Sequence, residues 1–199
     1  MRSRKYIRNR LAVLIVATGA GVYFAAAQWL LNQTPQKQEA RTQTATFAGG
    51  CFWSLEAAFR QVPGVTDTVV GYTGGTIGNP TYEAVSSHRV DHLEACRVTF
   101  DPAQISYEEL VDYFFKIHSP TATDHKGSYI GSPSRLVIFF HNAEQEAGAR
   151  AAREKWRKSG ESERRIITEI MVESQFYRAE EYHQRYLEKH GLASCRIQP

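Results

Sequence analysis

One cysteine in this sequence is placed where its thiol could act as a nucleophile. Gly49 and Gly50 separate a short apolar strand pattern from Cys51, and a helical pattern of apolar residues follows. We therefore expect Cys51 at a helix N-terminus, where the backbone N–H groups and the helix dipole favour the thiolate. Phe52 and Trp53 would give this sulfur an apolar, aromatic wall. A buried structural cysteine in a strand-to-helix turn remains the alternative.

Two further cysteines bear on this chemistry. Cys195 lies four residues before the C-terminus in a small and polar tail, where its thiol could reach a sulfenic acid on Cys51 and condense with it to a disulfide. Cys96 lies in an alternating run typical of a strand, and we interpret it as core packing. Three scattered cysteines fit neither a disulfide framework nor a CxxC metal site.

A thiolate that removes an oxygen atom also needs an acid to protonate that oxygen. Glu94 is a candidate, because it begins the same strand pattern as Cys96 and stands between the apolar Leu93 and Ala95. Burial there would raise the pKa of its carboxyl group and keep it protonated. An ordinary exposed glutamate on a strand is the alternative.

Two other chemistries fit the residues less well. A Cys-His hydrolase needs a histidine beside Cys51, and the sequence places none of its seven histidines there. His88 and His92 have a spacing used by metal ligands on helices, but a strand pattern follows and the H-E-x-x-H glutamate is missing. We therefore expect no metal.

Length and composition indicate one folded domain with an unusual N-terminus. The chain has 199 residues, of which 42% are hydrophobic, enough for one sizeable core. Its formal net charge is +3, but the first ten residues carry five positive side chains and the remainder has a net charge of −2. No basic surface for nucleic acid is therefore expected.

Four segments follow from this N-terminus. Residues 1–10 form a basic cytoplasmic flank, and 11–31 is a run of 21 uncharged residues that could be a transmembrane anchor or a signal peptide. Residues 32–43 form a polar linker, and 44–199 form the folded domain. Either interpretation of 11–31 places that domain on the extracytoplasmic, periplasmic side, membrane-anchored or secreted.

The domain pattern alternates strands and helices. Strands are predicted at 44–48, 66–72, 94–100, 135–140 and 165–173. Helices are predicted at 52–61, 106–118, 143–159 and 179–190, and 119–134 is a long loop. The β-α-β-β-α-β order favours an α+β sandwich with helices over one sheet, preceded by the N-terminal hydrophobic helix.

Several motifs of the chain occur together in one known family. They include Gly49-Gly50-Cys51-Phe52-Trp53, Gly71-Tyr72-Thr73-Gly74-Gly75, Asn79-Pro80-Thr81-Tyr82-Glu83, His92-Leu93-Glu94-Ala95 and Glu180-Glu181-Tyr182-His183-Gln184-Arg185-Tyr186. In order and spacing the chain resembles the A-type peptide methionine sulfoxide reductases, from residue 44 almost to its end.

The resemblance implies a ferredoxin-like two-layer sandwich that reduces methionine S-sulfoxide, free or in proteins, to methionine. It implies that Cys51 is the nucleophile and that Phe52 and Trp53 bind the substrate methyl group. Tyr82 and Glu94 would hold and protonate the sulfoxide oxygen.

The resemblance also implies how the enzyme is recycled. Cys195 matches the family's C-terminal recycling cysteine and would resolve the Cys51 sulfenic acid. An external thioredoxin-like dithiol would then reduce the disulfide, without a metal or an organic cofactor. The expected partners are therefore oxidised proteins or free methionine sulfoxide, this reductant, and the membrane through 11–31, with the domain a monomer.

One loop departs from the family pattern. Tyr129 stands where the family has an aspartate, and Ser134 stands where it has a second tyrosine that binds the sulfoxide. Losing that phenol would remove a donor to the developing oxyanion and lower activity, unless Tyr129 supplies a hydroxyl in its place. The alternative function is a catalytically weakened homologue that binds oxidised or Met-rich segments.

Overall fold

The computed structural model describes residues 42–117, 135–159 and 166–192. The chain divides into two units, Met1–Glu39 and Ala40–Pro199, and every described residue belongs to the second. The predicted anchor at 11–31 lies outside the described residues. Within the described ranges, no helix has the length and apolar character needed to cross a membrane.

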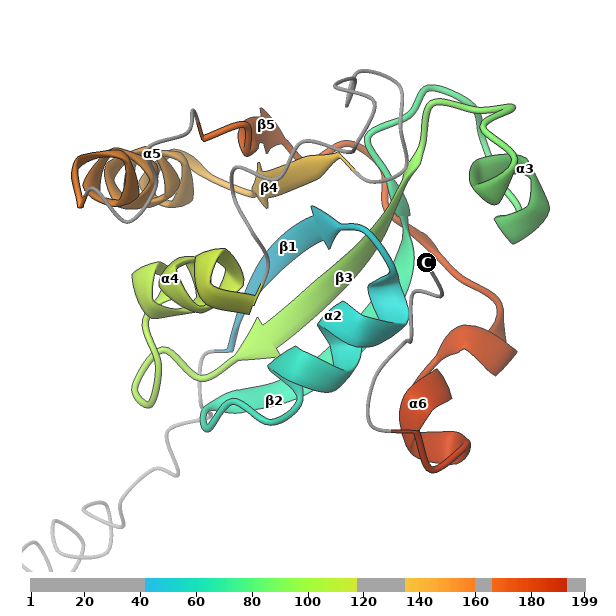
Figure 1. Ribbon diagram of the computed structural model, residues 1–199, viewed down its shortest axis with the longest axis horizontal. Helices are drawn as coiled ribbons and strands as arrows, with labels where there is room; N and C mark the ends of the chain where they lie inside the picture. Colours follow the sequence, from blue (N-terminus) through green and yellow to red (C-terminus); the bar gives the residue numbers. More distant parts are fainter. Residues whose placement is uncertain (1–41, 118–134, 160–165, 193–199) are drawn as a thin grey trace, which may run out of the picture. The chain divides into compact units, whose positions relative to one another are not determined.

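The described elements alternate as the sequence predicts (Figure 1). The strands are β1 (Gln43–Gly49), β2 (Val65–Thr73), β3 (Leu93–Phe100), β4 (Leu136–Phe140), β5 (Glu169–Val172) and β6 (Tyr177–Arg178). The helices are α2 (Phe52–Phe59), α3 (Tyr82–Ser86), α4 (Tyr107–Ile117), α5 (Ala143–Lys158) and α6 (Tyr186–Lys189), with a 3₁₀ turn at Glu181–His183.

The strands form one sheet in the order β5-β4-β1-β3-β2-β6. The four central strands pair antiparallel, whereas β5 runs parallel to β4, so the sheet is mixed. With α2 after β1 and α4 after β3, this is the split β-α-β order of a ferredoxin-like sandwich. The predicted α+β architecture is therefore confirmed for the described residues.

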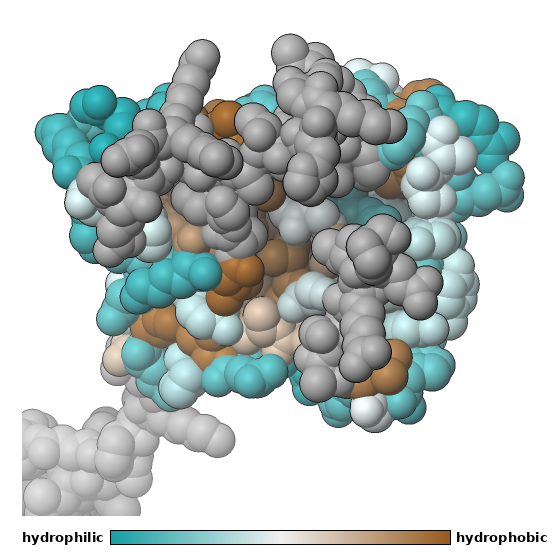
Figure 2. All heavy atoms as spheres, viewed as in Figure 1, coloured by the Kyte–Doolittle hydropathy of each residue, from teal (hydrophilic) through white to brown (hydrophobic). Residues whose placement is uncertain are grey.

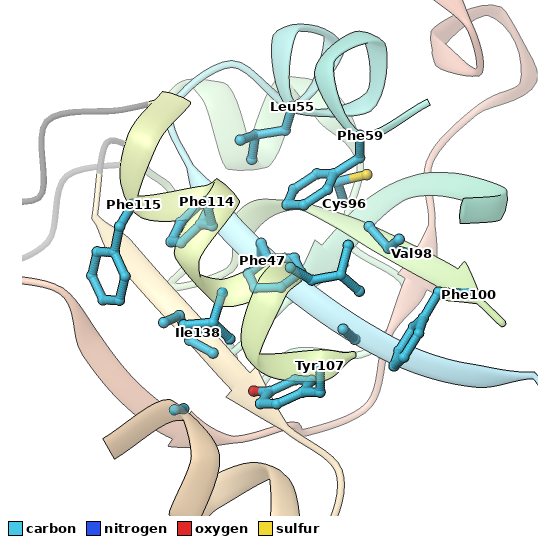
Figure 3. Packing of buried hydrophobic residues seen from close by; sticks show 14 of the residues in the cluster. Phe47, Leu55, Phe59, Cys96, Val98, Phe100, Tyr107, Phe114, Phe115 and Ile138 are labelled. Atoms are coloured by element: carbon cyan, nitrogen blue, oxygen red, sulfur yellow. The ribbon is translucent and has the colours of Figure 1, made fainter. Parts of the chain in front are cut away.

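The main core lies between the sheet and the helices α2 and α4, which lie over the same face in Figure 1. Phe47 of β1 packs between Phe59 of α2 and Phe114 of α4, with ring centroids 4.8 and 4.9 Å apart. All three rings are fully buried, as Figure 3 shows from close by. Each such side chain stabilises the fold by about 1.5–3 kcal/mol, so this core holds α2 firmly on the sheet.

Polar side chains surround this core at the surface. Figure 2 shows hydrophobic residues in the middle of the face that carries α2 and α4, with hydrophilic residues around them.

Cys96 of β3 belongs to the same core as Phe47. It has no exposed surface, and burial raises the pKa of its thiol well above the usual value. The interpretation of Cys96 as core packing is confirmed.

The prediction of one helix over 179–190 is wrong. The chain forms the 3₁₀ turn, becomes extended at Gln184 and is left-handed at Arg185, where φ is 54°. Gln184 is held extended because its amide bonds the backbone of Val70 and Ala179. The Arg185 N–H donates to the buried carboxylate of Glu56, at 2.7 Å, instead of to a helical carbonyl.

The structure differs from the predicted elements in three further places, and two of these differences have a local reason. The short α3 was not predicted, and it starts at Thr81, whose hydroxyl caps it by accepting from the Ala84 N–H. The two-residue β6 was also not predicted, and it fits against β2 only because Gly71 lacks a Cβ, which would lie 2.4 Å from the Tyr177 carbonyl oxygen. The strand predicted at 165–173 is reduced to the four residues of β5.

Candidate active site

Cys51 is the N-cap residue of α2. Gly50 has a φ of 78°, which a glycine adopts without strain, and turns the chain sharply from β1 into the helix. The Cys51 carbonyl then accepts the first helical hydrogen bonds, from Ser54 N–H at 3.1 Å and Leu55 N–H at 3.4 Å. The thiol is half-buried and forms no disulfide with Cys96. The predicted position at a helix N-terminus is confirmed.

Glu94 meets this same helix end from the start of β3. The Phe52 N–H, the first inside α2, donates to Glu94 Oε2 at 3.2 Å. Burial raises the pKa of the Glu94 carboxyl group, and the hydrogen bond from Phe52 only partly opposes that shift. A carboxyl group with a raised pKa therefore lies beside the residue that follows Cys51, as an acid for this site would require.

The aromatic residues after Cys51 have different roles in packing. Phe52 is buried, and its ring lies 6.0 Å from Tyr72 and 6.3 Å from Tyr82 between centroids. Trp53 is half-buried and stacks on Tyr186 of α6 at 3.9 Å, with the rings inclined by 12°. The two side chains thus form an apolar wall, with Phe52 as its base and Trp53 closer to the surface.

Tyr82 is brought to this wall by α3. It is the first residue of that short helix, 31 positions after Cys51 in the sequence, and its ring lies nearly parallel to that of Phe52, at 16°. The structure therefore gathers Cys51, Phe52, Trp53, Tyr82 and Glu94 around one end of α2.

Two residues that contact this site were not singled out from the sequence, because their neighbours are distant in the chain. His183 Nδ1 accepts from the indole N–H of Trp53 at 3.0 Å, and its ring lies 4.4 Å from Tyr82 between centroids. Glu180 accepts from the Tyr72 hydroxyl at 2.7 Å and from the Tyr82 N–H at 3.2 Å.

The electrostatics of this pair follow from burial. Burial lowers the pKa of His183, although the Glu180 carboxylate opposes this, so the imidazole is neutral at pH 7. Burial acts to raise the pKa of Glu180, but hydrogen bonds to its carboxylate, among them those from Tyr72 and Tyr82, together with His183 lower the pKa below its ordinary value. A neutral histidine and an ionised glutamate therefore stand behind the aromatic wall. The only signal in the sequence was the motif that contains both residues.

Three residues of the predicted chemistry, Cys195, Tyr129 and Ser134, lie outside the described residues. The two histidines considered as metal ligands lie in different environments. His88 is in an exposed turn, whereas His92 is buried and its ring packs against Tyr177. In the described ranges, no group of three or more His, Cys, Asp and Glu side chains is arranged to hold a metal ion.

Comparisons with known proteins agree with this geometry. The family model for peptide methionine sulfoxide reductase matches residues 43–199. A peptide methionine sulfoxide reductase MsrA from Methanoculleus marisnigri is 49% identical over 158 residues, which are 79% of this chain and 96% of that protein. The family match begins one residue before the predicted start of the folded domain at residue 44.

Solved structures are similar as well. Methionine sulfoxide reductase A of Corynebacterium diphtheriae has a TM-score of 0.67 and 32% identity, covering 81% of this chain and 80% of that one. Mxr1 from Saccharomyces cerevisiae in complex with Trx2 has a TM-score of 0.52 and 28% identity, covering 77% of this chain and 91% of that one.

Proposed function

This chain belongs to the peptide methionine sulfoxide reductase family and reduces methionine sulfoxide, and from that premise we propose that Cys51 is its nucleophile and Glu94 its acid. The Cys51 thiolate attacks the sulfoxide sulfur while Glu94 donates a proton to the sulfoxide oxygen. A bond forms between the two sulfur atoms as the S–O bond of the substrate breaks, and with a second proton from solvent the oxygen leaves as water. Attack of water on the Cys51 sulfur then breaks the bond between the two sulfur atoms, returns one proton to solvent and leaves Cys51 as a sulfenic acid. Methionine leaves as the reduced product, so the two electrons come from the Cys51 sulfur.

The contact that carries this proposal is the hydrogen bond from the Phe52 N–H to Glu94. It places the Glu94 carboxyl group next to the end of α2 that Cys51 caps. Burial raises the pKa of this carboxyl group, as the acid needs, although the Phe52 N–H acts in the opposite direction. Phe52 and Trp53 supply the apolar wall for the substrate methyl group, and Tyr82 on α3 is the second ligand of the oxygen. The stereochemical preference proposed is for the S epimer.

Recycling is proposed to use Cys195 and an external dithiol. The Cys195 thiol displaces water from the sulfenic acid and forms a disulfide with Cys51. A thioredoxin-like protein then reduces this disulfide, a proposal supported by the solved complex of the relative Mxr1 with Trx2. No organic cofactor or metal takes part in these steps.

The place of action is proposed to be the extracytoplasmic side of a membrane. This rests on the basic residues 1–10 and the uncharged 11–31, which together favour an anchor whose following domain is exported. The substrates would then be oxidised proteins outside the cytoplasm.

The decisive experiment measures turnover. The full chain in mild detergent is incubated with a peptide that contains either epimer of methionine sulfoxide and with excess dithiothreitol, and methionine is quantified. We expect turnover of the S epimer only, lost in Cys51→Ser. Absence of turnover with both epimers would refute the mechanism and favour the weakened, binding homologue that Tyr129 and Ser134 suggest.

A further inference from the structure

His183 is a buried titratable group for which the proposed mechanism has no step. Its side chain is 1% exposed and its ring is surrounded by the rings of Phe52, Trp53, Tyr82 and Tyr182, with centroids 4.1–5.5 Å away. Three of these neighbours are proposed substrate contacts, namely Phe52, Trp53 and Tyr82. The buried imidazole therefore contacts both the proposed wall for the methyl group and the proposed ligand of the sulfoxide oxygen.

The hydrogen bond to Trp53 fixes which nitrogen of His183 carries the proton. An indole N–H can only donate, so His183 Nδ1, 3.0 Å away, must be unprotonated. The neutral ring then carries its proton on Nε2. Nε2 is buried without a hydrogen-bond partner among the described residues, and it lies 3.8 Å from Glu180 Oε2.

Glu180, which lies near His183 Nε2, is also hydrogen-bonded to Tyr72 and Tyr82. Its carboxylate accepts from the Tyr82 N–H at the start of α3 and from the Tyr72 hydroxyl on β2. Tyr186, three positions after His183, stacks on the ring of Trp53. The orientation of Trp53 and the placement of Tyr82 thus depend on one short segment, Glu180–Tyr186.

We propose that His183 is a positioning residue of this reductase, which holds the Trp53 indole through Nδ1 and, together with Glu180, keeps the methyl wall and the oxygen-binding Tyr82 in register. The inference rests on the proposed roles of Trp53 and Tyr82. Its physical basis is that small displacements of groups around the reacting atoms cost a large part of the rate. His183 acts through Trp53 and does not itself touch the substrate.

A double-mutant cycle in the full chain tests this proposal. Initial rates are measured with an S-sulfoxide peptide and dithiothreitol for His183→Leu, Trp53→Phe and the double variant. Trp53→Phe keeps an aromatic ring but removes the indole N–H. We expect His183→Leu to lower kcat/KM roughly tenfold, the worth of one hydrogen bond, and to have little further effect in the Trp53→Phe background.

Conservative variants keep the test decisive if His183→Leu does not fold. The amide oxygen of asparagine takes the place of Nδ1, whereas the amide of glutamine reaches the place of Nε2. His183→Asn should therefore retain kcat/KM within about threefold of the wild type, and His183→Gln should lose roughly tenfold. Equal activity of these two variants would overturn the proposal.

A matched control variant, at His141, shows whether the effect of His183→Leu comes from positioning Trp53 or simply from losing a hydrogen-bonded imidazole. His141 is also partly buried and bonded, to Thr46 at 3.0 Å and Glu173 at 3.1 Å, on the other face of the sheet. His141→Leu should have the same effect in the wild type and in Trp53→Phe. If His183→Leu is likewise additive with Trp53→Phe, the inference is wrong, although the proposed site stands. If Trp53→Phe alone costs nothing, the indole N–H bond to His183 contributes nothing to the rate and the inference is wrong, although the aromatic wall, which this variant keeps, stands.

Discussion

At the scale of single residues, the proposed chemistry depends on a carboxyl group whose pKa is raised by burial. Glu94 has two opposing influences, since burial penalises its charged form and the Phe52 N–H favours it. Burial is the larger of the two, so the folded state holds the Glu94 proton above pH 4.5, its ordinary pKa. Its contribution to stability is therefore fully present below pH 4.5 and is lost as the pH rises through the folded-state pKa.

Glu94→Gln should therefore separate activity from stability. The amide cannot donate the proton, so we expect kcat to fall about a hundredfold or more. It also carries no buried charge, so at pH 7.5 its free energy of unfolding should equal or exceed that of the wild type. Rates and urea denaturation at pH 4.5 and 7.5 provide the measurement. A variant with unchanged kcat would contradict the role of Glu94 as the acid.

Cys96 should be inert despite its thiol. Its burial among core side chains keeps it protonated and out of reach of solvent. We expect Cys96→Ala to leave kcat unchanged and to lower the free energy of unfolding by about 1 kcal/mol. Alkylation of the native wild type by iodoacetamide, followed by mass spectrometry, should label Cys51 and spare Cys96. Rapid labelling of Cys96 would contradict this prediction.

At the scale of elements, the segment after β6 is shaped by partners on other elements. Gln184 makes two hydrogen bonds with Val70 of β2 and one with the Ala179 carbonyl, all buried. Glu56 on α2 accepts from the Arg185 N–H, and burial raises the pKa of the Glu56 carboxyl group. These contacts hold α6, and with it Tyr186, against the helix that carries Cys51.

Gln184→Ala should show how much this anchoring contributes. It removes three buried hydrogen bonds to the Val70 N–H, the Val70 carbonyl and the Ala179 carbonyl, of which the Val70 carbonyl keeps a bond from the Ala179 N–H. We therefore expect a loss of about 2–4 kcal/mol in the free energy of unfolding. Chemical denaturation measures it. Gln61→Ala is the matched control, because that glutamine is exposed and bonds only the Ala57 carbonyl, and it should change stability by less than about 0.5 kcal/mol. Equal losses in the two variants would refute the anchoring role.

At the scale of the whole molecule, the family domain and the N-terminal segment are separate units. The family model starts at residue 43, where β1 begins, and leaves residues 1–42 unmatched. The family match therefore lies in the second unit, whereas the proposed location rests on the first.

The location is tested by fractionation of cells that make the full chain. We expect the protein in the membrane fraction, and replacement of 11–31 by a polar linker should release it without changing its turnover. Protease added outside the cytoplasmic membrane should digest the domain. Protection of the domain from that protease would contradict an extracytoplasmic location.

What the sequence by itself determined is local. The glycines before Cys51 and the helical pattern after it were enough to place this residue at the start of α2, and the alternation around Cys96 was enough for β3. Strand and helix patterns depend on neighbours a few positions apart, so one chain without its fold reveals them. The family motifs added the roles of Tyr82 and Glu94, which no pattern of spacing indicates.

What only the tertiary structure decided depends on partners far apart in the chain. Phe52 and Glu94 are 42 residues apart, and Trp53 and His183 are 130 apart, so neither contact could be predicted from local spacing. The helical pattern over 179–190 was misleading for the same reason. Gln184 and Arg185 form their hydrogen bonds with β2 and α2, because those bonds satisfy buried polar groups that a continuous helix would leave unpaired.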